Sequence, residues 1–241
     1  MPTHLDELCE RAAHRHQPLF SRFLNLTEQK EAEAAARRAS ASWLLFGGAD
    51  DCERRMLGVG AEAPDPADFP LVCLKVSRRS AHYGEALTHR AVLGTVMGTG
   101  IERELIGDIV LLDGDAYIFC VTAMADMLCQ ALTRVGRSDT DCAVVPPPAQ
   151  ALRTLKPVTI QAASPRVDAV TAHLYHMSRG DTLELIRQGR IQIDDLPVTK
   201  PDQLLKPGQV LSVRGFGRAR YDGETGVSKK GRLYLSLSVY S

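Results

Sequence analysis

The chain of 241 residues is 44% hydrophobic, a content typical of a globular protein with a packed core. Its 29 basic and 29 acidic residues leave no net charge, so the overall charge excludes a uniformly basic nucleic-acid-binding chain. The length favours two or three modules over one large domain.

Cysteine spacing and apolar runs bear on chemistry and location. The six cysteines include no Cys-x-x-Cys pair, so we expect free thiols in a reducing cytoplasm, with no metal and no cofactor. Charges occupy the N-terminal positions where a signal peptide needs an apolar run, and no stretch has the length of a membrane span. We therefore expect a cytoplasmic protein without a membrane partner.

Hydrophobic periodicity predicts helices and strands along the first part of the chain. Residues 1–41 are predicted as helices, with Thr27 as a candidate cap for the helix over 28–41. Strands are predicted over 42–46, 55–60, 71–76, 107–112, 117–121 and 143–145, and further helices over 88–97 and 122–133. Interleaved strands and helices with one hairpin favour an α+β domain of ferredoxin-like or RRM-like form.

Three parts are predicted from this pattern. They are N-terminal helices and first strands over 1–72, a ferredoxin-like α+β domain over 73–148 and a small C-terminal α/β domain over 165–241, with Pro146-Pro147-Pro148 as a boundary. The third part carries 12 basic against 8 acidic residues, whereas the first 164 residues carry 17 against 21. Positive charge is therefore concentrated in the C-terminal part.

The segment from Pro165 to Ile193 predicts two short helices. Apolar residues recur at three- and four-residue spacing from Val167 to Met177, which places them on one helix face. Ser178 can cap the second helix while Asp181 returns the bond, as in a capping box. Gly189 stands where a helix commonly ends.

This helix pair is basic. The positive charge of Arg179, at the start of the second helix, opposes the helix macrodipole. The same position suits a phosphate, because a guanidinium and free backbone N–H groups can bind it together. Ordinary solvated arginines are the alternative interpretation. The basic residues that could bind phosphate here are Arg166, Arg179, Arg187 and Arg190.

The order of these residues resembles the S-four RNA-binding domain, named after the fourth protein of the small ribosomal subunit. The likeness lies in Arg166-Val-Asp, a helix, Ser178-Arg179, a second helix and Gly189-Arg190-Ile-Gln-Ile. The resemblance implies that the two helices and the following strand grip structured RNA. The positions that match the family are Arg166, Ser178, Arg179, Gly189 and Arg190. The residues predicted to contact RNA in this part are Arg166, Ser178, Arg179, Arg187 and Arg190.

A basic segment follows before the final strand. Leu233, Leu235, Leu237 and Val239 alternate as a strand with one buried face. Phe216 in the preceding segment either stacks on a base or forms an aromatic plug under a mobile hairpin. The further residues predicted to contact RNA are Arg214, Arg218, Arg220, Lys229 and Lys230.

A second resemblance covers most of the chain. Three segments carry it: Leu44-Leu-Phe-Gly-Gly, His89 to Glu104 with its Met97-Gly-Thr-Gly-Ile core, and Gly107-Asp-Ile. In these segments the chain is similar to the YlmH family of bacterial ribosome-associated proteins. Thr99 departs from the family pattern. The resemblance implies a protein that binds large ribosomal subunits still holding peptidyl-tRNA after a stall, in quality control of the nascent chain.

The glycine-rich segment has two open interpretations. Its glycines follow a helix rather than a strand, which argues against a nucleotide-binding loop. They either form a second surface facing RNA or tRNA, or pack a tight corner in which Arg90 and Arg103 pair with neighbouring glutamates. The candidate residues of the second surface are His89, Arg90, Gly98, Gly100 and Arg103.

Enzymatic alternatives find little support. Residues Arg166 to Thr171 fit the Arg-x-Asp-x-x-Thr core of pseudouridine synthases. However, the glycines that normally flank this motif are missing, and the motif lies within the helix pair. Asp168 is therefore interpreted as a residue at the start of a helix. A methyltransferase would need a doubly wound domain that the pattern lacks. We predict no catalytic residue and no small-molecule substrate.

The predicted function is non-catalytic binding to rRNA of the large ribosomal subunit, with tRNA as a further partner. Phosphate contacts would supply affinity, and RNA shape would supply specificity. An S-four-domain rRNA-modifying enzyme and a large-subunit assembly factor remain alternatives. A module that docks a protein partner through the acidic N-terminal half is the alternative without RNA.

Overall fold

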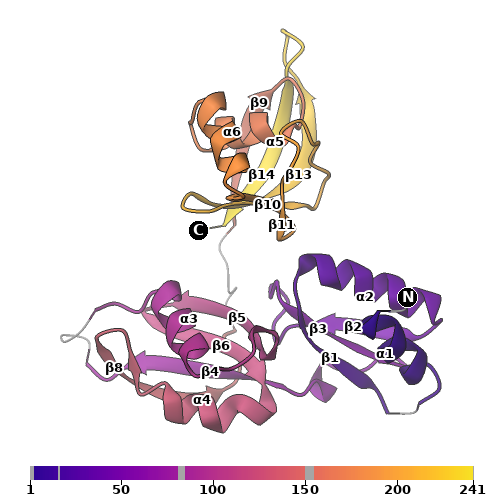
Figure 1. Cartoon of the computed structure of the whole chain (residues 1–241), viewed down its shortest axis with the longest axis vertical. Coiled ribbons are helices and arrows are strands. Elements are labelled where there is room, and N and C mark those ends of the chain that lie inside the picture. The colour runs from indigo at the N-terminus through magenta and orange to yellow at the C-terminus, as the bar shows by residue number, and fades with distance from the viewer. Residues whose placement is uncertain (1–2, 16, 81–84, 150–154, 241) are drawn as a thin grey trace. The chain divides into compact units, whose positions relative to one another are not determined.

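The computed structural model describes residues 3–15, 17–80, 85–149 and 155–240, and it divides into two compact units (Figure 1). Unit 1 comprises Met1–Leu152 and unit 2 comprises Arg153–Ser241. Helices and antiparallel sheets occur in both, so the predicted α+β class is confirmed.

Unit 1 begins with two helices on a small sheet. Its elements are α1 (His4–Ala12), β1 (Leu19–Leu24), α2 (Leu26–Arg38), β2 (Ser42–Phe46) and β3 (Arg55–Gly60), with the strands ordered β1-β3-β2. The helices bury Leu8 and Ala32 against Leu57 and Val59 of the central strand. Every pairing in this sheet is antiparallel.

The prediction of helices throughout residues 1–41 is wrong at β1. This strand buries Phe23 and Leu24 and pairs with β3, a contact that spans more than 30 residues of sequence and leaves no local signal. Thr27 is not the cap of α2. Asn25 caps it instead, accepting the backbone N–H groups of Thr27 and Glu28 at 3.0 and 2.9 Å.

The second sheet of unit 1 is ferredoxin-like. Its elements are β4 (Leu71–Arg78), α3 (His89–Gly98), β5 (Ile106–Leu112), β6 (Asp115–Val121), α4 (Ala125–Ala131), β7 (Arg134–Val135) and β8 (Ser138–Val145), with single 3-10 turns at Pro66–Asp68, Arg103–Leu105 and Thr122–Met124. The strand order is β5-β6-β4-β8-β7. In the repeat β4-α3-β5-β6-α4-β8 this order places the first and third strands side by side at the centre, which is the arrangement of the ferredoxin-like form expected from the sequence.

Alternation along the strands gives this sheet two buried faces. Leu74 and Ile118 point toward Val96 of α3 and Leu128 of α4. The opposite face carries Cys73, Val110 and Phe119, which pack against Phe23 and Met56 of the first sheet. The N-terminal segment therefore covers the face that α3 and α4 leave open, and both sheets share one unit.

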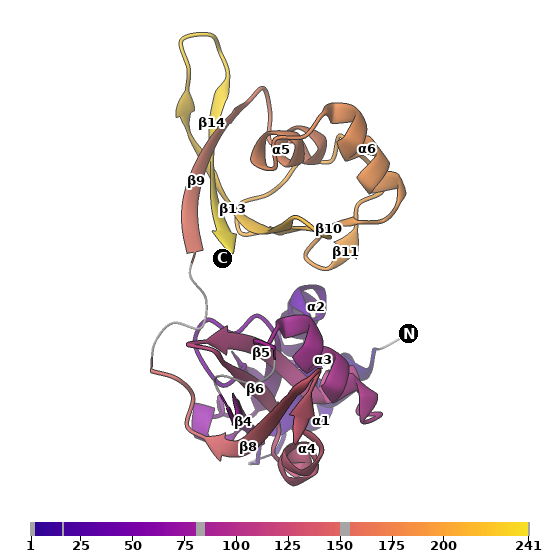
Figure 2. The ribbon, with the colours of Figure 1, turned by 90° about the vertical axis from the view of Figure 1, so that its left-hand side faces the viewer.

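Unit 2 is a six-stranded antiparallel sheet with two helices on one face (Figure 2). Its elements are β9 (Leu155–Ala162), α5 (Val167–Leu174), α6 (Arg179–Arg187), β10 (Ile191–Ile193), β11 (Leu196–Pro197), β12 (Val210–Val213), β13 (Gly217–Val227) and β14 (Leu233–Tyr240). Val170 and Ile186 of the helices bury against Tyr221 and Leu237 of the sheet.

Local chemistry explains the limits of α6. Ser178 accepts the backbone N–H of Asp181 at 3.1 Å, and the Asp181 carboxylate accepts the backbone N–H of Ser178 at 3.3 Å. The predicted capping box is therefore confirmed. Gly189 follows the helix with φ +65°, a left-handed conformation that glycine adopts at low cost.

Two further observations concern the described residues. None of the helices in the described ranges is long and apolar enough to cross a membrane. Within those ranges, no group of three or more His, Cys, Asp or Glu side chains is placed to hold a metal ion.

Candidate nucleic-acid interface

A buried carboxylate joins the starts of α5 and α6. Asp168, in the first turn of α5, accepts hydrogen bonds from Arg166 Nε and Nη2, both at 3.0 Å. It also accepts from Arg179 Nε at 3.1 Å and Nη2 at 2.9 Å. Its side chain is 1% exposed, whereas those of Arg166 and Arg179 are 35% and 67% exposed. Asp168 therefore anchors two guanidiniums whose outer edges face solvent.

The electrostatics of this arrangement favour an ionised Asp168. Burial by itself raises the pKa of Asp168, but hydrogen bonds from Arg166 and Arg179 outweigh it and lower the pKa below its ordinary value. One carboxylate between two guanidiniums leaves one net positive charge. The charge of Arg179 at the N-terminus of α6 is thus offset by Asp168 rather than left to oppose the macrodipole alone.

The sequence predicts Asp168 only as a residue at the start of a helix. The structure places it in the first turn of α5, as expected, and adds a role in positioning Arg166 and Arg179. The signal available in the sequence was an acidic residue two positions after one arginine and eleven before another. That spacing acquires meaning only once α5 and α6 pack together.

Arg190 organises the loop before β13. Its Nη2 donates to the backbone carbonyl of Arg214 at 2.8 Å, and the backbone N–H of Arg214 donates to the Arg190 carbonyl at 2.9 Å. Gly215 has φ +92°, and a Cβ there would lie 2.9 Å from Arg190 Nη2. Arg187, by contrast, extends into solvent with 76% of its side chain exposed, 3.5 Å from Glu184.

Phe216 combines features of both interpretations offered for it. The side chain is 51% exposed, and its ring centroid lies 5.8 Å from that of Tyr175 at a tilted angle. One side of the ring is therefore packed on the end of α5, while the remainder stays accessible for stacking.

Arg218 and Arg220 lie on the sheet face opposite the helices. Their strand neighbours Ala219 and Tyr221 are buried beneath α5 and α6, so alternation turns both arginines the other way. Arg218 donates to Ser212 Oγ at 2.9 Å and lies over the Tyr240 ring at 5.7 Å. The structure thus divides the predicted RNA-contacting residues between two faces.

The tip of the β13–β14 hairpin carries a third group of cations. Lys229 and Lys230 are exposed in the turn between the two strands, which projects beyond the helices in both views (Figures 1 and 2). This tip belongs to neither the helix pair nor the opposite sheet face.

The candidate second surface lies in unit 1 along α3. His89 and Arg90 occupy its first turn and are exposed, and Gly98 ends it. A Cβ added at Gly94, Gly98 or Gly100 would meet no atom within 4 Å. The tightly packed corner offered as the alternative is therefore not observed.

Arg103 differs from the other residues of this set. Its Nη1 donates to the backbone carbonyls of Ile106 and Gly107 at 2.5 and 3.3 Å, and burial lowers its pKa to about 10. The expected pairing of Arg103 with glutamate is replaced by these carbonyl contacts, while Glu102 forms an ion pair with Arg22. Arg103 supports the start of β5.

Comparisons with known proteins find a family model, a curated relative and a solved structure that are similar to this chain. Residues 64–146 match the family model described as "Putative RNA-binding domain in YlmH". The chain is 29% identical over 222 residues to "Ribosome-associated protein quality control protein P2" of Bacillus subtilis (strain 168), covering 89% of this chain and 84% of the relative. It is also similar to the structure of "Cell division protein ylmH from Streptococcus pneumoniae", with 23% identity, a TM-score of 0.49, and coverage of 59% of this chain and 87% of that chain.

The match to a putative RNA-binding domain and the similarity to a ribosome-associated relative support an RNA-binding protein of the α+β class. Within that class, the chain is similar to the YlmH family, whose RNA-binding domain model matches residues 64–146. The family resemblance drawn from the sequence is therefore confirmed.

Proposed function

We propose that this chain is a non-catalytic protein that associates with the ribosome and docks on rRNA of the large subunit, in particular on stalled subunits that carry peptidyl-tRNA. The curated relative from Bacillus subtilis is named as a ribosome-associated quality control protein. The observation that carries the proposal is the pair of guanidiniums, one partly and one largely exposed, that are fixed on buried Asp168.

In this proposal, Arg166 and Arg179 bind phosphates of folded rRNA. Their hydrogen bonds to Asp168 hold both side chains before RNA arrives, so less side-chain entropy is lost on binding. Charge-assisted contacts to phosphate supply affinity and register, and the shape of the RNA supplies specificity.

The remaining cations extend this footprint by separate surfaces. Lys229 and Lys230 at the hairpin tip reach RNA that lies beyond the helix pair. Unit 1 contributes the exposed side of α3, where Arg90 and the open glycines let a tRNA or rRNA backbone approach closely. Arg218 and Arg220 would engage a different RNA segment, because they face away from α5 and α6.

The experiment is sedimentation of the tagged full-length chain with bacterial ribosomes at low and high salt, with each fraction probed for tRNA. Arg179→Ala should weaken RNA association by about 1–3 kcal/mol, as expected for one charge-assisted contact. Arg166 stays on Asp168 in this variant, so the carboxylate is not left unpaired. Arg37→Ala is the matched control, because its side chain is 70% exposed and pairs with Glu33 on α2.

The proposal expects co-migration with free large subunits that retain tRNA, reduced by Arg179→Ala but not by Arg37→Ala. Association should also fall steeply as salt increases, because phosphate contacts release counterions. Protein that stays at the top of the gradient at low salt would overturn the proposal. Co-migration with subunit precursors without tRNA would replace it by an assembly role.

A further inference from the structure

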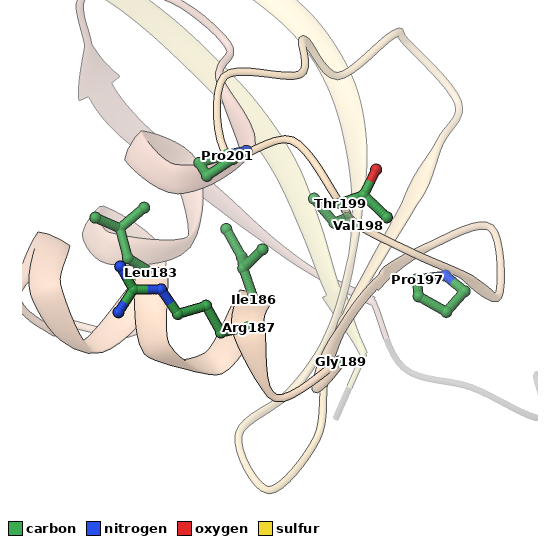
Figure 3. Close-up of a pocket in the computed structure, with 8 residues that line it drawn as sticks. All are labelled: Leu183, Ile186, Arg187, Gly189, Pro197, Val198, Thr199 and Pro201. Atoms are coloured by element: carbon green, nitrogen blue, oxygen red, sulfur yellow. The ribbon is translucent and has the colours of Figure 1, made fainter.

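An apolar groove runs along α6 beside the segment that follows β11 (Figure 3). Its volume is about 500 Å³, within the range of sites that hold small ligands. Leu183 and Ile186 of α6 form one wall and the segment from Pro197 to Pro201 forms the other. Arg187 and Thr199 are its polar lining residues.

A second cavity adjoins this groove. Its volume is about 320 Å³, and its lining residues are Arg166, Asp168, Arg179, Leu183, Pro201 and Asp202. Leu183 and Pro201 line both cavities. The fixed arginine pair and the apolar groove are therefore neighbouring parts of one surface, separated only by the side chains that they share.

We propose that these two cavities form a binding site for one unpaired RNA nucleotide. Its phosphate binds Arg166 and Arg179, and its base enters the groove between Leu183 and Pro201. This inference rests on the proposed RNA-binding function and narrows the ligand to a bulged, looped or flipped-out nucleotide. A paired base is excluded, because its faces are stacked and its edge is engaged within the duplex.

The chemistry of the linings fits a nucleotide. A base has two apolar faces and a polar edge, which match an apolar groove bordered by Arg187 and Thr199. Asp202 lines the same cavity as the two arginines, and its carboxylate can accept a hydrogen bond from a ribose hydroxyl or a base N–H group. An apolar protein side chain would fill the groove but would add no anion to the two guanidiniums, which share the single carboxylate of Asp168.

The test compares two RNA hairpins with the full chain, one with a single bulged 2-aminopurine and one with the same 2-aminopurine paired. The bulged hairpin should bind roughly tenfold more tightly, the effect expected from one accommodated base. Fluorescence of the bulged 2-aminopurine should change on binding, because its surroundings change from water to the groove. Equal affinity for the two hairpins would overturn the inference.

Leu183→Ser should weaken binding of the bulged hairpin more than binding of the paired hairpin, and so abolish the preference for the bulge. Leu183→Met keeps an apolar side chain of similar volume and should retain the preference. Leu196→Ser is the control outside the groove, since Leu196 is 56% exposed and lines neither cavity. Hydrogen exchange of α6 checks that Leu183→Ser remains folded.

The two proposals fail in different ways. If Arg179→Ala leaves binding of both hairpins unchanged, the proposed function itself loses its support. If Arg179→Ala weakens both hairpins and the bulge preference survives Leu183→Ser, RNA binding stands and the nucleotide site is refuted.

Discussion

Asp168 and Arg179 are eleven residues apart, yet the Asp168 carboxylate accepts the Arg179 Nε and Nη2 groups at 3.1 and 2.9 Å. The contact ties the first turn of α5 to the first turn of α6. A buried acid thus determines where an exposed cation lies, and the ion pair serves positioning as well as stability.

Asp168→Asn should lower the stability of unit 2 by about 1–3 kcal/mol, because the amide lacks the negative charge and its NH2 group replaces one acceptor oxygen that faces arginine donors. The arginines are partly exposed and can return to water, which keeps the cost below that of stranding a buried charge. Hydrogen exchange of α5 and α6 in the full chain measures the change. Unaltered protection of both helices would contradict the anchoring role.

The same pair gives unit 2 a dependence on acid. The folded pKa of Asp168 is lowered, so its stabilising contribution is present above the ordinary carboxylate pKa and is lost as pH falls through the folded pKa. Asp168→Asn should remove this part of the acid sensitivity.

Gly94→Ala and Gly98→Ala should each stabilise unit 1 by about 0.5–1 kcal/mol, because alanine favours the helix and its Cβ meets open space. Fluorescence of Trp43, the single tryptophan, reports urea unfolding of this unit. If these glycines admit an RNA backbone, the same variants should bind RNA more weakly despite being more stable.

Gly100→Ala is the matched control for that series. Its φ of +82° is unfavourable for alanine, so this substitution should destabilise unit 1 although the added Cβ has room. A stabilising effect at position 100, or a destabilising one at 94, would contradict the helix geometry of this segment.

Tyr175→Phe should leave unit 2 equally stable or more stable by up to about 1 kcal/mol. Among the described residues, the Tyr175 hydroxyl has no hydrogen-bond partner, and burial raises its pKa to about 12. Removing a buried, unpaired hydroxyl avoids its desolvation cost. Hydrogen exchange of β13 and β14 measures the effect, and marked destabilisation would reveal a partner for the hydroxyl.

Unit 1 should lose stability at alkaline pH. Burial raises the pKa of Cys73 and of Cys120 to about 12, whereas an unfolded thiol ionises near pH ~8.5. Between these values only the unfolded chain releases the proton, so stability falls as pH rises, by at most about 1.4 kcal/mol per pH unit for each thiol.

Urea unfolding followed by Trp43 fluorescence at several alkaline pH values tests this behaviour. Cys120→Ala should be less stable at neutral pH, because it leaves a cavity, but should show a shallower loss with rising pH. An identical slope in the variant would mean that Cys120 does not contribute.

Local signals in the sequence predicted the structure correctly where the contacts that stabilise that structure are also local. Ser178, Asp181 and Gly189 delimit α6 through bonds that span only a few residues, and the prediction matched the structure there. Strand and helix periodicity likewise indicated the ferredoxin-like order of β4 to β8.

Non-local contacts decided what could not be predicted from the sequence. β1 forms because Phe23 and Leu24 find a partner strand in β3, and tertiary pairing overrides weak local preference. Asn25 rather than Thr27 caps α2 because the helix begins directly after that strand.

The candidate site shows the same division. Its arginines could be named from the sequence, because the order of residues around the two helices resembles a known RNA-binding domain. Their grouping required the structure: packing of α5 on α6 brings Arg179 to Asp168, and the register of β13 turns Arg218 and Arg220 to the opposite face. Residue identity sets which charges are present, whereas contacts between distant segments set which charges can act together.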